Sequence, residues 1–204
     1  MGNLTQKSIP LLISKLTSAI ATTTRNRDIG AAINRREDIK YELARRGEAA
    51  IEPLLDLLKR SDDGTCDHAA AVIGQIGSPA AVVPLAHILA EPYPPHTKQC
   101  ASKALRAINT PEAVLAVNIW HSRQTDIRQQ ILTFMQQGTA SDPLQACLQQ
   151  LATRRNTTPH HIAEAYLLMT SEESLSTDAQ QRLNALRLSP NECALIEGVL
   201  QQND

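Results

Sequence analysis

Cysteine and histidine occur at metal-ligand spacing in two stretches of the chain. Cys66 stands two residues before His68, and His96 stands four residues before Cys100. On a helix the second spacing places both side chains on one face, and stacked neighbouring helices would make a zinc site geometrically conceivable. However, Cys66 and His68 point about 200° apart on a helix, and no closed four-ligand spacing is present. We therefore expect buried cysteines, exposed histidines and no metal site.

Other catalytic constellations are missing from the sequence. No serine or cysteine lies in a recognisable nucleophile elbow, and no glycine-rich loop is suited to cradling phosphates. We therefore expect no catalytic residue and no cofactor.

Polar residues recur at a fixed spacing on predicted helices. Asp56, His87, Asn118 and Gln149 follow one another at intervals of 31 residues. Each falls on the polar side of its helix, which indicates either an ordinary solvated face or the concave, partner-binding groove of a helical repeat protein. Two further polar residues flank this row, and one tyrosine stands in a proline-rich connector. The candidate protein-binding residues are Asp56, Lys59, His87, Asn118, His121, Gln149 and Tyr93.

The elements that carry this row repeat about every thirty residues. Four segments share one plan: an apolar helix, a Gly or Asn, a short turn containing Pro, and a second apolar helix. The punctuating residues Gly47, Gly77, Asn109 and Gly138 are 30, 32 and 29 residues apart. Gly and Asn tolerate the left-handed conformation that ends a helix, and Pro suits the first turn of the next one. The pattern predicts helix pairs that stack into an α-solenoid, since one pair alone cannot bury its apolar face.

These segments resemble a known repeat family. Gly77–Leu85 (GSPAAVVPL), Ala101–Ile108 (ASKALRAI) and the helix opening Asp126–Arg128 (DIR) are similar to the short HEAT-like repeat first described in phycobilin lyase subunits of cyanobacteria. The resemblance covers about residues 36–154. It implies an all-α armadillo/HEAT-like superhelix, and it is not specific for an activity.

The resemblance and the repeat plan together predict the domain organisation. We expect one α-solenoid domain over residues 1–204, with about four helix pairs and helical caps. Residues 1–34 form N-terminal cap helices, 35–154 the HEAT-like repeats and 155–204 divergent C-terminal helices. Terminal repeats are expected to be atypical because one of their faces meets water.

Composition narrows the possible functions. The net charge is −1 and aromatic residues make up 2% of the chain, which argues against gripping a nucleic-acid backbone or stacking on bases. None of the six histidines precedes a glutamate, so the His-Glu pairs of di-iron HEAT-repeat hydroxylases are missing. No apolar run approaches the ~20 residues of a membrane span. We therefore expect a cytoplasmic protein that binds neither nucleic acid nor membrane.

The function that these observations favour is non-enzymatic. We expect a scaffold, adaptor or assembly factor that binds another protein on a concave solenoid face. The resemblance implies an alternative, a phycobilin lyase subunit or phycobilisome-processing factor, which would be the enzymatic case. A toxin-neutralising immunity protein is a third reading of a small solenoid.

Overall fold

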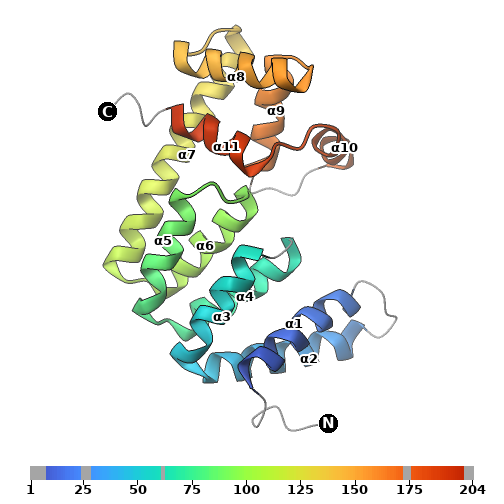
Figure 1. Ribbon diagram of the computed structural model, residues 1–204, viewed down its shortest axis with the longest axis vertical. Helices are drawn as coiled ribbons and strands as arrows, with labels where there is room; N and C mark the ends of the chain where they lie inside the picture. The colour runs from blue at the N-terminus through green and yellow to red at the C-terminus, as the bar shows by residue number, and fades with distance from the viewer. Residues whose placement is uncertain (1–7, 24–28, 61–62, 172–175, 200–204) are drawn as a thin grey trace. The chain divides into compact units, whose positions relative to one another are not determined.

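The computed structural model describes residues 8–23, 29–60, 63–171 and 176–199, and every regular element in these ranges is helical (Figure 1). The chain forms two compact units: Met1–Leu89 with Thr97–Val117 (the N-terminal unit), and Ala90–His96 with Asn118–Asp204 (the C-terminal unit). The all-α prediction is confirmed. The single solenoid domain stays a prediction. Among the described residues, no helix is long and apolar enough to cross a membrane.

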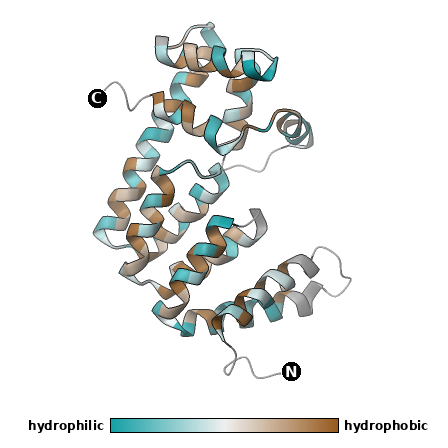
Figure 2. Ribbon diagram, in the orientation of Figure 1, coloured by the Kyte–Doolittle hydropathy of each residue, from teal (hydrophilic) through white to brown (hydrophobic). Residues whose placement is uncertain are grey.

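Helices packed on one another build the N-terminal unit. α1 packs on α2, α3 packs on α4, and α2 also contacts α4. By sequence position, the predicted repeats consist of α2 with α3, α4 with α5, and α6 with the start of α7. In α3 the buried Ile51, Leu54 and Leu58 alternate with exposed charged residues, so one side of the helix is hydrophobic (Figure 2). The elements are α1 (Ile9–Thr23), α2 (Ile29–Arg45), η2 (Gly47–Ala50), α3 (Ile51–Arg60), α4 (Asp63–Ile76), η3 (Pro79–Ala81), α5 (Val82–Ala90), α6 (Pro95–Ile108) and the start of α7 (Pro111–Gln137).

Neighbouring helix pairs touch at positions about one repeat apart. Ser78, one residue after Gly77, donates a hydrogen bond of 2.8 Å to Oε1 of Glu48, one residue after Gly47. A Cβ built on Gly74 of α4 would lie only 2.7 Å from the Cβ of Ala107 on α6. Only a glycine lets these two helices approach so closely. These two contacts join residues that are 30 and 33 positions apart in the sequence.

The punctuating residues adopt the conformation that their types predict. Gly47, Gly77, Asn109 and Gly138 have φ values of 58°, 67°, 55° and 72°, in the left-handed region that ends helices. Asn156, with φ 51°, ends α8 in the same way and was not predicted.

Two boundaries differ from the sequence-based expectation. α7 is one helix of 27 residues, where separate helices were expected for the end of the third pair and the start of the fourth. No Gly or Pro occurs between Glu112 and Gln137, so nothing in the sequence interrupts the helix. The expected limit of the N-terminal cap at residue 34 falls inside α2. Residues 1–7 and 24–28 of that cap lie outside the described residues.

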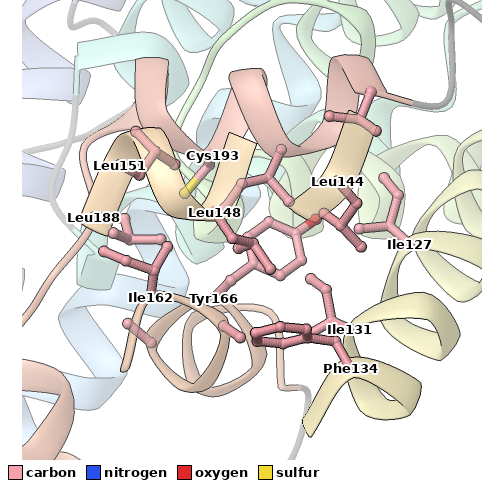
Figure 3. Close-up of a cluster of buried hydrophobic side chains, with 14 of the residues drawn as sticks. Ile127, Ile131, Phe134, Leu144, Leu148, Leu151, Ile162, Tyr166, Leu188 and Cys193 are labelled. Carbon is pink, nitrogen blue, oxygen red and sulfur yellow. The ribbon is translucent and has the colours of Figure 1, made fainter. Parts of the chain in front are cut away.

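The C-terminal unit has a core of its own (Figure 3). The phenol ring of Tyr166 is fully buried among leucine and isoleucine side chains, and its hydroxyl donates to Oε1 of Gln124 at 3.2 Å. Burial raises the pKa of Tyr166 far above its usual value. Core side chains come from the later part of α7 and from α8, α9 and α11. The remaining helices are α8 (Asp142–Arg155), α9 (Pro159–Met169), α10 (Thr177–Ala185) and α11 (Pro190–Gly198).

The left-handed helix ends give a stability prediction. Gly138 has φ 72° and open space around its Cα, so Gly138→Ala adds backbone strain without a steric clash. We expect a loss of about 1 kcal/mol in the free energy of unfolding, measured by urea denaturation. Gly138→Asn should cost less than about 0.5 kcal/mol, because Asn tolerates this conformation.

The matched control is Gly198→Ala. Gly198 also has open space around it but lies in α11 without a positive φ. This variant should be neutral or slightly stabilising. Equal effects of the two alanine variants would contradict the assignment of strain to Gly138.

Candidate functional site

The predicted contact residues of the N-terminal unit lie outside its core. Lys59 on α3 and His87 on α5 are exposed. Asp56 on α3 is half-exposed and forms an ion pair with Arg60 at 3.6 Å. All three stand on the second helix of a pair, as the sequence predicts. Whether they contact a partner stays a prediction.

The other predicted contact residues belong to the C-terminal unit. Asn118 on α7 and Gln149 on α8 are exposed, whereas His121 is half-buried with its ring centroid 4.8 Å from that of Trp120. Tyr93, in the connector before α6, is half-buried.

Two apolar side chains are exposed on helices of the N-terminal unit, and the predicted row of polar residues gave no indication of them. Val83 on α5 is 78% exposed and Leu115 on α7 is 60% exposed. Each stands six residues after a punctuating residue, Gly77 or Asn109, so they occupy equivalent positions of successive pairs. Val83 also lies one turn before His87, on the same face of α5. Aligning the repeats on Gly77 and Asn109 would have found this match in the sequence.

Two cysteines of the N-terminal unit lie on neighbouring helices. Cys66 on α4 and Cys100 on α6 are fully buried, and no disulfide joins them. His68 on α4 is half-buried. Burial lowers its pKa, and the positive charges of Arg36 and Lys40 lower it further.

A carboxylate and an amine stand beside the two thiols. The Sγ of Cys100 donates to Oδ1 of Asp67 at 3.5 Å, and Nζ of Lys103 donates to the same oxygen at 2.9 Å. This hydrogen bond raises the pKa of Lys103, so its ammonium group stays charged at neutral pH. These two hydrogen bonds tie α6 to α4 within the N-terminal unit.

The C-terminal unit contains a cavity of about 390 Å³ between α8, α9 and α10. Its lining includes Arg155, Thr157, His161, Glu164 and Arg182. Both arginines already pair with carboxylates: Arg155 with Glu192, and Arg182 with Glu164. These pairs balance the guanidinium charges that line the cavity.

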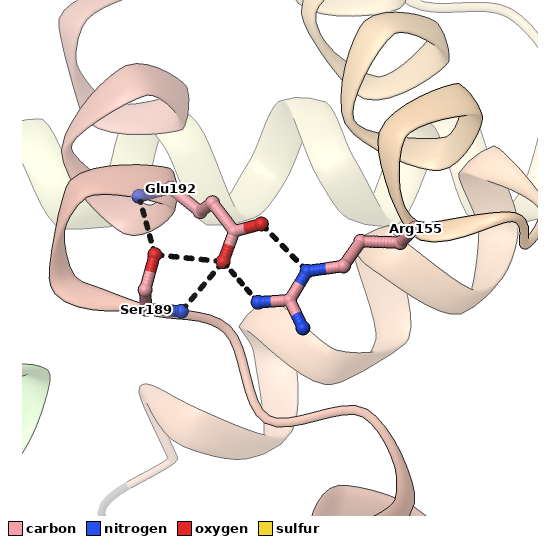
Figure 4. Close-up of polar contacts among 3 residues, drawn as sticks. All are labelled: Arg155, Ser189 and Glu192. Carbon is pink, nitrogen blue, oxygen red and sulfur yellow. Dashed lines mark hydrogen bonds and ion pairs between the residues drawn. The ribbon is translucent and has the colours of Figure 1, made fainter.

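The pair of Arg155 and Glu192 also fastens the start of α11 (Figure 4). Nε of Arg155 donates to Oε1 of Glu192 at 2.7 Å. The backbone N–H of Ser189 donates to Oε2 of Glu192 at 2.7 Å, and the Ser189 hydroxyl accepts from the N–H of Glu192 at 3.3 Å. Arg155 and the capping hydrogen bonds lower the pKa of Glu192 to about 2. This is a structural role, since it ties α8 to α11.

Comparisons with models of protein families, with curated proteins and with solved structures find no match for this chain. The resemblance to the HEAT-like repeat therefore stays a prediction based on the sequence motifs.

The depressed pKa of Glu192 predicts a pH dependence of stability. The folded value of about 2 lies below the ordinary 4.5, so this carboxylate stabilises the fold above pH 4.5. Its contribution is lost as the pH falls from about 4.5 to 2. Glu192→Gln keeps the capping geometry but removes the charge. We expect this variant to lose about 1–2 kcal/mol at pH 7, the value for a charge-assisted hydrogen bond discounted for partial exposure.

Urea denaturation between pH 2.5 and 7 measures this effect. The stability curves of the native chain and of Glu192→Gln should converge as the pH falls. Adding Arg155→Gln to Glu192→Gln should cost little more, because both changes remove the same interaction. Parallel curves across this pH range would contradict the assignment.

Proposed function

We propose that this chain is a protein-binding module whose N-terminal unit stacks helix pairs as an α-solenoid. The partner binds the exposed face of the second helices, α3, α5 and the start of α7. The observation that carries the proposal is the exposure of Val83 and Leu115 at equivalent positions of successive pairs. A single exposed apolar residue is ordinary, but recurrence at one repeat position gives a row of apolar contacts.

The contacts between pairs support the stacked arrangement. Ser78 and Glu48 bond across a separation of 30 residues, and Gly74 meets Ala107 across 33. Stacking of this kind repeats each surface position at a constant displacement. Solenoids use such repeated surfaces to bind extended partners.

The polar residues beside this row supply specificity. Asp56 and Lys59 on α3 and His87 on α5 flank the apolar positions on the same helices. Apolar anchors with a charged rim are the usual composition of protein–protein interfaces. In the C-terminal unit, Asn118, His121 and Gln149 stay predicted contact residues of the same kind.

The exposed apolar pair can be tested by substitution with a charge. Val83→Asp and Leu115→Asp change surface positions, so we expect the fold and its unfolding midpoint to be retained. Loss of one interface anchor costs about 2 kcal/mol, or roughly 30-fold in Kd. The combined variant should therefore retain no partner in a pull-down from a lysate of the source organism, read by quantitative mass spectrometry.

Leu195→Asp is the matched control. Leu195 is 46% exposed on α11 in the C-terminal unit, and this variant should capture the partner as the native chain does. Equal capture by Val83→Asp/Leu115→Asp and the native chain would contradict the proposed face. The partner's identity separates the readings: a phycobiliprotein subunit favours a lyase role, and a toxin favours an immunity role.

A further inference from the structure

We propose that Arg36, Lys40 and His68 form a binding site for a phosphate group where α2 packs on α4. Arg36 and Lys40 lie on α2 and His68 lies on α4, and all three belong to the N-terminal unit. The two helices contact each other within that unit. The site uses other helices than the proposed partner-binding face on α3, α5 and the start of α7, so each proposal can fail without the other.

Arg36 carries a buried nitrogen that lacks an acceptor. Its Nε atom is buried and, within the part of the chain that the structure describes, it has no hydrogen-bond partner. The ion pair of Nε with Oε1 of Glu37 is 3.9 Å long, which is too long for a hydrogen bond. A buried N–H without an acceptor is unfavourable. An anion that accepts from Nε would remove this penalty.

Lys40 places a second cation beside Arg36. It stands four residues later on α2, so both side chains leave the same face of the helix. Each is only 17% exposed, although lysine and arginine mostly extend into water. Nζ of Lys40 donates to both oxygens of Glu37, at 2.9 and 3.2 Å, and the Glu37 side chain is 53% exposed. One half-exposed carboxylate therefore serves two largely buried cations.

His68 adds a third nitrogen donor from the neighbouring helix. Its side chain is half-buried on α4. Burial lowers the pKa of His68, and the positive charges of Arg36 and Lys40 lower it next in order of size. A charge changes a pKa in this way only from nearby. The three basic groups therefore lie close to one another, with the imidazole neutral at pH 7.

Two carboxylates, Glu37 and Asp67, lie near these groups but do not balance them. Each raises the pKa of His68 by less than either cation of α2 lowers it. Asp67 accepts a hydrogen bond from Nζ of Lys103 on α6 at 2.9 Å, so it is paired with a cation of its own. With His68 neutral, three positive and two negative charges leave the group at +1. The group therefore attracts an anion.

A tetrahedral oxyanion suits this set of donors. A guanidinium group donates in a planar fork that matches two oxygens of a phosphate, and an ammonium group serves as a point charge beside it. A neutral imidazole donates one N–H, and both ring nitrogens donate once it is protonated. A phosphate group accepts through several oxygens and carries up to two negative charges. The ligand is a phosphate group, either as the free ion or on a larger molecule.

The test measures phosphate binding by the full chain. The chain is titrated with sodium phosphate, and with sodium chloride at equal ionic strength, by calorimetry and by thermal unfolding. We expect saturable binding of phosphate alone and a higher unfolding temperature, because the anion binds the folded chain. Phosphoserine, titrated in the same way, distinguishes the two sources. Equal binding supports a phosphate carried by a larger molecule, and weaker binding supports the free ion.

Variants separate this site from general attraction of anions. Arg36→Gln and Lys40→Gln should each weaken phosphate binding by about tenfold, the value for one charge-assisted hydrogen bond. Glu37→Gln should strengthen binding, because it removes the carboxylate that competes for both cations. Arg35→Gln is the matched control. It removes the same charge as Arg36→Gln from an exposed neighbouring position on another side of α2, and it should bind as the native chain does.

His68 gives a readout that a merely structural role of these side chains would not change. Sulfate does not titrate near neutral pH, so the pH dependence of its binding comes from the protein. A bound dianion favours the charged imidazolium and raises the pKa of His68. Sulfate should therefore bind more tightly as the pH falls below 6.5, the ordinary histidine value. His68→Gln should abolish this pH dependence.

Two results would overturn the proposal. One is a folded native chain that responds to phosphate no more than to chloride. The other is phosphate binding that Arg36→Gln and Arg35→Gln weaken equally, which is the behaviour of nonspecific attraction. The first result depends on no variant, so it is decisive even if a substitution in α2 disturbs the fold. Circular dichroism spectra establish that each variant in the second comparison is folded.

Discussion

The distance between α4 and α6 is set by the contact of Gly74 with Ala107, and much of the N-terminal unit depends on it. A Cβ at position 74 would come within 2.7 Å of the Ala107 methyl carbon, closer than two such carbons can pack. Dispersion and the exclusion of water favour the shortest approach that the side chains permit. The absence of a side chain at Gly74 therefore lets the first helices of neighbouring pairs lie almost in backbone contact.

Contacts near the starts of the same helices depend on that approach. The thiol of Cys100 and the ammonium group of Lys103 both donate to the Asp67 carboxylate of α4. The second helices of the same repeats carry Val83 and Leu115, which are exposed at equivalent positions. We propose that the partner binds there.

The sequence predicts local structure well where one residue decides it. Gly47, Gly77, Asn109 and Gly138 end helices in the left-handed conformation because few other residues tolerate it. The sequence predicts local structure poorly where a helix continues only because no residue interrupts it. The uninterrupted α7 follows from the lack of Gly and Pro between Glu112 and Gln137, which a search for repeats does not register.

The contacts between α4 and α6 could be predicted only in part. Neighbouring first helices were expected to stack, but which turn of α4 faces which turn of α6 depends on side-chain packing and not on periodicity. The sequence therefore did not predict that Cys100 and Lys103 would both donate to Asp67. The exposure of Val83 and Leu115 likewise depends on which helix sides are covered. That is a property of the tertiary structure.

The most direct test of this account is a double-mutant cycle on Gly74 and Ala107, measured by urea denaturation. Gly74→Ala should cost about 1–3 kcal/mol by overpacking, although alanine is the better helix former. Adding Ala107→Gly should recover at least about 1 kcal/mol relative to additive effects, because it removes the clashing methyl group. Additive changes, or a Gly74→Ala variant more stable than the native chain, would contradict the close packing of α4 on α6.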